Sequence, residues 1–69
     1  MPCYVFYEDG THTVHDKWPS TRYLPRNCYA NFEGEHAYPW GIPSGESGWD
    51  DIDEHDVPPE IRMRLLLIT

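Results

Sequence analysis

The sequence has no lysine or arginine from Asn27 to Ile61, and it has no long uninterrupted run of apolar residues. A helix that spans a bilayer needs about 18–20 consecutive apolar residues, so we expect no transmembrane segment and no membrane partner. The first ten residues lack a basic stretch followed by an apolar core, which predicts no signal peptide. We therefore expect a cytoplasmic protein.

Motifs for catalysis and metal binding are also missing. The sequence contains no Cys-x-x-Cys knuckle, no His-Glu-x-x-His helix, no glycine-rich phosphate loop and no nucleophile elbow. An EF-hand loop that begins at Asp51 would place Asp56 where glycine is required and Arg62 where the bidentate glutamate is required. His12 and His15 would point to opposite faces of one strand. We therefore expect no catalytic residues, no metal site and no cofactor, and we do not expect an enzyme.

Cysteine is scarce: the chain has two, Cys3 and Cys28. Without a sign of secretion, cysteines stay reduced and behave as small apolar side chains. We expect two buried thiols, and one disulfide between neighbouring strands is the alternative.

Aromatic residues supply the material for a core. The 69 residues include five tyrosines, three tryptophans and two phenylalanines, and such side chains bury large areas each. A chain of this size has room for one domain, so we assign residues 1–69 to a single domain and expect a monomer. The sequence predicts a small α+β fold.

The first half of the chain predicts an antiparallel sheet of about three strands. Cys3–Tyr7 is rich in β-branched and aromatic residues, and Thr11–His15 returns from it after an Asp9-Gly10 turn, which predicts an N-terminal hairpin. Cys28–Glu33 alternates in the manner of a third strand.

The segment that follows has the composition of a connection. Residues 34–48 contain two prolines and four glycines, and they begin the acidic part of the chain. We expect a long, irregular, Pro/Gly-rich acidic connection that Trp40 and Ile42 hold to the core.

The C-terminal residues fit two periodicities. Pro58 and Pro59 suit the first turn of a helix, in which Ile61 and Leu65 share a face and Glu60 can pair with Arg64. Alternation from Ile61 to Leu67 also fits a strand. We favour a short C-terminal helix.

Negative charge is concentrated in one half of the chain. Of the net charge of −7, residues 1–26 contribute nothing, because three acids there balance three bases. Residues 27–61 hold nine carboxylates without a lysine or arginine, and seven of them lie between Glu46 and Glu60. Crowded carboxylates are expected to have pKa values raised by their neighbours.

This charge has the opposite sign from that of a nucleic-acid-binding protein, so we expect no direct contact with nucleic acid. Acids at positions i and i+2 of an extended chain lie about 6–7 Å apart, and phosphates rise about 3.4 Å along a DNA strand. The pairs Glu33/Glu35, Asp51/Asp53 and Glu54/Asp56 have this spacing. The spacing indicates a surface that could occupy a groove built for DNA. Our candidate partner-binding residues are Glu33, Glu35, Glu46, Asp50, Asp51, Asp53, Glu54 and Asp56, with Trp49 and Tyr38 as aromatic anchors.

The combination of small size, acidic charge, abundant aromatics and no catalytic motif resembles small phage-encoded inhibitors of host defence, such as anti-CRISPR and DNA-mimic proteins. The resemblance implies a stoichiometric inhibitor that acts in the host cell cytoplasm and blocks DNA access to a basic nucleic-acid-binding host protein or complex. It implies no particular fold, because such inhibitors have unrelated folds. The alternatives are a small divalent-metal-binding module, a regulatory or antitoxin-like interaction module, and an acidic face that serves solubility.

Overall fold

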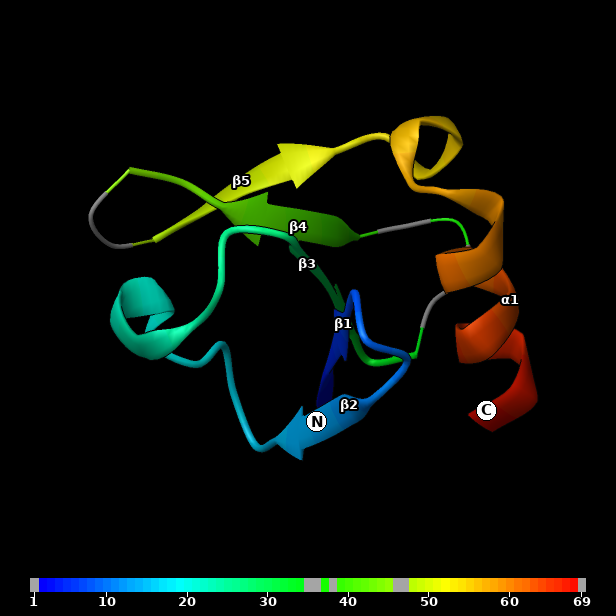
Figure 1. Ribbon diagram of the computed structural model, residues 1–69, viewed down its shortest axis with the longest axis horizontal. Helices are drawn as coiled ribbons and strands as arrows, with labels where there is room; N and C mark the ends of the chain where they lie inside the picture. The colour runs from blue at the N-terminus through cyan, green and yellow to red at the C-terminus, as the bar shows by residue number, and fades with distance from the viewer. Residues whose placement is uncertain (1, 35–36, 38, 46–47, 69) are drawn as a thin grey trace.

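A computed structural model describes residues 2–34, 37, 39–45 and 48–68. In these residues the chain forms a five-stranded antiparallel sheet with the strand order β2-β1-β3-β4-β5, and one α-helix (Figure 1). The strands are β1 (Cys3–Tyr7), β2 (His12–His15), β3 (Cys28–Phe32), β4 (Trp40–Pro43) and β5 (Trp49–Ile52). The helix is α1 (Pro59–Ile68), and two short 3₁₀ segments are η1 (Thr21–Tyr23) and η2 (Glu54–Asp56).

The predicted N-terminal hairpin is confirmed. β1 pairs with β2 in antiparallel register, with Cys3 opposite His15 and Phe6 opposite His12. The turn closes because Asp9 Oδ1 accepts hydrogen bonds from the Thr11 amide at 2.9 Å and the Thr11 hydroxyl at 2.6 Å. Gly10 has φ +94°, a conformation that glycine adopts at no steric cost.

The sheet has five strands rather than the predicted three, because residues expected to form an irregular connection contribute β4 and lead into β5. Pro43 lies at the end of β4, opposite Trp49, and a strand tolerates proline at its edge or end. Gly41 lies in a tight contact: a Cβ there would be 3.0 Å from ring atoms of Trp18, so the ring would have to shift to admit it. The predicted anchor Trp40 is fully buried, whereas Ile42 is half-buried.

The sheet lies between two layers, with α1 on one face and the segment that carries η1 on the other (Figure 1). On the helix face, Phe6 and Trp40 pack with Ile61 and Leu65 of α1 and with Val57. On the opposite face, the core consists of small side chains covered by larger ones: Cys3, Val5, Cys28 and Ala30 lie beneath Tyr7, Trp18, Leu24, Phe32 and Trp49.

The C-terminal segment is a helix, so the strand alternative is wrong. Ile61 and Leu65 are buried on the face that meets the sheet, as the helical period requires. The expected pairing of Glu60 with Arg64 is replaced by another contact, because Arg64 Nη1 donates to the Tyr7 carbonyl at 2.9 Å. None of the helices in the described residues has the length and apolar character needed to cross a bilayer.

Both cysteines are buried free thiols, as expected. In the pairing of β1 with β3, Cys3 lies opposite Phe32 and Cys28 lies opposite Tyr7. Four residues of strand, roughly 13 Å, therefore separate the two thiols, too far for a disulfide. Burial raises the pKa of the Cys3 thiol to about 11.

Candidate functional site: an acidic sheet edge

Five of the candidate acids lie on one continuous segment at the edge of the sheet. This segment is β5 followed by η2, and β5 has β4 as its neighbour on one side and none on the other in the sheet order. We call its carboxylates the acidic edge: Asp50, Asp51, Asp53, Glu54 and Asp56. Four of these residues are exposed and Glu54 is half-buried, so the charges are presented to solvent.

The backbone changes conformation midway along the acidic edge. The chain is extended through Asp53, which has φ −67° and ψ 142°, and it then enters the 3₁₀ turn of η2. The predicted spacing of about 6–7 Å therefore applies to Asp51 and Asp53. It does not apply to Glu54 and Asp56, because a 3₁₀ helix rises only about 2 Å per residue.

Asp50 and Asp51 point to opposite faces of the sheet. Asp50 lies opposite Ile42 and therefore faces the helix side, and Asp51 lies opposite Gly41 and faces the Trp18 side. The acidic edge thus presents carboxylates around the rim of the sheet rather than in a single row.

Asp53 is held in place by its neighbour. Its Oδ1 accepts hydrogen bonds from the His55 amide and from His55 Nδ1, both at 2.9 Å, which makes Asp53 the N-cap of η2. These two hydrogen bonds lower the pKa of the Asp53 carboxyl, and the charge of a protonated His55 adds to the effect. The expectation that crowding would raise the pKa values is therefore wrong for Asp53, which stays ionised at neutral pH.

The arginines that follow the acidic edge in the sequence do not neutralise it. Arg62 Nε donates to the Val57 carbonyl at 3.2 Å, and Arg64 donates to the Tyr7 carbonyl. Among pairs in which both residues are described, the one ion pair shorter than 4 Å joins Asp53 to His55, which is charged only when protonated. The two arginines therefore do not compensate the negative charge of the acidic edge.

A shallow groove runs beside the acidic edge. Its volume is about 280 Å³, and it is lined by Asp51, Asp53, Glu54, His55, Ile52 and Ala37. Sequence reasoning did not include Ile52, His55 or Ala37, although the first two belong to the same short segment. In the part of the chain that the structure describes, no group of three or more histidine, cysteine or carboxylate side chains is placed to hold a metal ion.

The remaining candidate residues lie elsewhere. Glu33 is exposed in the turn after β3 with φ 70°, at the same end of the sheet as Asp53 but separated from it by β4. Glu35, Tyr38 and Glu46 lie outside the described residues.

Trp49, expected as an aromatic anchor for a partner, packs inside the molecule. Its ring centroid lies 5.2 Å from that of Trp18, and its Nε1 donates to the Pro19 carbonyl at 2.9 Å. The side chain is half-buried, so most of its contact area is used to attach β5 to the segment that follows β2.

Comparison with protein-family models, with curated proteins and with solved structures finds no match in any of the three.

Proposed function

We propose that the protein is a non-enzymatic, stoichiometric inhibitor. It binds a basic nucleic-acid-binding protein through the acidic edge and blocks access of DNA to that protein. The observation that carries the proposal is the exposed carboxylate segment from Asp50 to Asp56, whose neighbouring arginines are bonded to backbone carbonyls. A surface of this kind attracts the lysines and arginines that a DNA-binding groove offers to phosphates.

A second explanation of the same charge is protection of the sheet edge. Carboxylates on an edge strand keep it from pairing with the edge of another molecule. The two explanations differ in what the acids do when a basic partner is present, and an experiment with partner proteins separates them.

The test uses a variant in which Asp50→Asn, Glu54→Gln and Asp56→Asn remove three negative charges. These side chains suit the test because none of them makes a hydrogen bond to another described residue in the structure. The parent protein, immobilised and exposed to a bacterial lysate, should retain a DNA-binding protein that a short duplex DNA displaces. The variant should retain at least about 10-fold less, because charge complementarity sets both encounter and selectivity.

The matched control also raises the net charge by three, but on a different surface. Asp16→Lys with Tyr23→Lys does so at two exposed positions on the segment between β2 and β3. The control should capture the partner as the parent does. Equal loss in both variants, or capture that duplex DNA does not displace, would contradict DNA mimicry by the acidic edge.

A further inference from the structure

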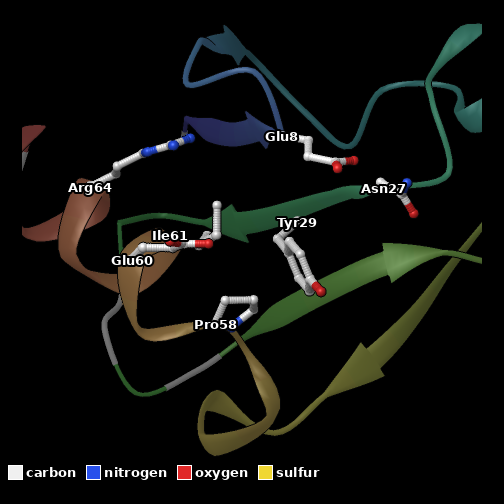
Figure 2. Close-up of a pocket in the computed structure, with 7 residues that line it drawn as sticks. All are labelled: Glu8, Asn27, Tyr29, Pro58, Glu60, Ile61 and Arg64. Atoms are coloured by element: carbon white, nitrogen blue, oxygen red, sulfur yellow. The ribbon is translucent and has the colours of Figure 1, made fainter.

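The helix covers only part of its face of the sheet. α1 packs over Phe6 and Trp40, while Tyr29, the partner of Phe6 in β3, remains half-buried. Beside Tyr29 is an open cleft of about 340 Å³, lined by residues of the hairpin turn, the start of β3 and the first turns of α1. Figure 2 shows these side chains around an open space, with Glu8 and Asn27 on one rim and Glu60 and Ile61 on another.

The cleft combines an aromatic ring with carboxylates on separate elements. Tyr29 and Ile61 provide apolar surface, and Pro58 extends it. Glu8 comes from the turn that follows β1, and Glu60 comes from the first turn of α1. Both carboxylates are exposed, and neither forms an ion pair within 4 Å with another described residue.

Among the described residues that line the cleft, Arg64 is the one basic residue, and its guanidinium forms its hydrogen bond at the hairpin. Arg64 Nη1 donates to the Tyr7 carbonyl, and its guanidinium lies near the hairpin turn, 3.7 Å from the position of a Cβ on Gly10. There its charge acts on Asp9, whose pKa is lowered mainly by the hydrogen bonds from Thr11 and to a smaller extent by Arg64. Glu8 and Glu60 are therefore left to attract a cation from outside.

We propose that this cleft binds an arginine side chain of the basic partner, an assignment that rests on the proposed function. The guanidinium stacks on the ring of Tyr29, Glu8 and Glu60 accept its N–H groups, and its aliphatic stem lies along Ile61. A planar guanidinium donates to carboxylates in a fixed fork and stacks on aromatic rings, whereas a lysine ammonium is a compact, strongly hydrated charge. The two carboxylates repel an anionic ligand.

The position of the cleft fits a partner that also contacts the acidic edge. The edge ends at Asp56, and Pro58, in the lining of the cleft, is two residues further along the chain. Two residues span at most about 7 Å, so one basic surface can reach both sites.

The first test needs no partner. N-acetyl-arginine amide is titrated into the labelled protein while backbone and Tyr29 ring signals are followed by NMR. We expect saturable shifts at Glu8, Tyr29 and Glu60, with a dissociation constant on the order of millimolar. The citrulline analogue, which has nearly the same shape without the charge, should bind at least about 10-fold more weakly, and the lysine analogue should also bind more weakly.

Variants then assign the interaction to named groups. Glu8→Gln with Glu60→Gln should weaken arginine amide binding about 10-fold, because each substitution removes a charged acceptor. Tyr29→Phe keeps the ring and should bind nearly as the parent does, whereas Tyr29→Leu should lose binding. Asp16→Asn, which removes an exposed carboxylate outside the lining, is the control and should leave binding unchanged.

Failure of the cleft and failure of the proposed function give different results. Absence of shifts at the cleft, or equal binding by the double glutamine variant, overturns the arginine site whatever partner is captured. Arginine amide binding without any partner that duplex DNA displaces overturns the proposed function and leaves the cleft as an arginine site. If a partner is captured, unchanged capture by the double glutamine variant overturns the assignment of the arginine to that partner.

Discussion

At the scale of single residues, the lack of a side chain at Gly41 lets the Trp18 ring pack against the sheet. The aromatic ring of Trp18 lies directly over Gly41, and Trp18 also stacks on Phe32 with ring centroids 5.7 Å apart. Together with Trp49, these rings hold β4 and β5 to the rest of the sheet, and so they position the acidic edge.

We therefore expect Gly41→Ala to destabilise the protein by about 1–3 kcal/mol, because the added methyl group would force the packed Trp18 ring to move. The free energy of unfolding from urea titration measures this cost. In a Trp18→Leu background the same substitution should cost much less, since the two sites share one contact. An equal cost in both backgrounds would show that the contact between Gly41 and Trp18 is not the cause.

At the scale of secondary structure, the sequence predicted elements that depend on local signals. The hairpin follows from β-branched residues around Asp9-Gly10, and the helix follows from Pro59 and the spacing of Ile61 and Leu65. β4 could not be predicted in this way, because glycine and proline are rare in strands. Gly41 is explained by the Trp18 ring that packs against it, and Pro43 is explained by its position at the end of the strand.

The same distinction applies to the candidate sites. The acidic edge is contiguous in the sequence, so its carboxylates can be identified as a group from the sequence alone. The cleft joins Glu8, Tyr29 and Glu60, which are far apart in the sequence and meet only because β1 pairs with β3 and α1 packs on both. No local pattern connects these three residues.

Because Asp53 caps η2, the stability of the fold should depend on pH. The folded-state pKa of Asp53 is lowered by the hydrogen bonds from His55, so Asp53 binds its proton more weakly when folded than when unfolded. Its stabilising contribution is therefore present above the unfolded pKa of about 3.9 and is lost as the pH falls through the lower, folded value.

We expect Asp53→Ala to lower the melting temperature at pH 7, and the difference from the parent should shrink as the pH falls below about 4. Thermal unfolding followed by circular dichroism from neutral to acidic pH measures this difference. Asp53→Asn, which still accepts the amide hydrogen bond, should lose less than the alanine variant at neutral pH. A difference that stays constant over the whole range would mean that the Asp53 charge does not contribute.

At the scale of the whole molecule, the uneven distribution of charge acts over the longest distance. The net charge of −7 comes from the half of the chain after residue 26, and its described carboxylates include the acidic edge and Glu60 of the cleft. Such a field acts before contact, because it draws a basic partner over distances up to the Debye length, about 10 Å at 0.1 M salt.

Binding to the basic partner should therefore depend strongly on salt. We expect the dissociation constant to rise at least about 10-fold between roughly 50 and 300 mM salt, mostly through a slower association rate, as stopped-flow or surface-based kinetics would measure. The variant with Asp50, Glu54 and Asp56 neutralised should have a flatter salt dependence than the parent. A parent association rate that does not change with salt would indicate that the acids do not steer the encounter.

The core that α1 shares with β1 and β4 also bears on how the chain folds during synthesis. Phe6 and Trp40 are buried by Val57, Ile61 and Leu65, and Arg64 bonds to Tyr7 across 57 residues of sequence. A nascent chain on the ribosome that has released all five strands still exposes this apolar face to water. We therefore expect the complete native core to form only after the residues of α1 have emerged.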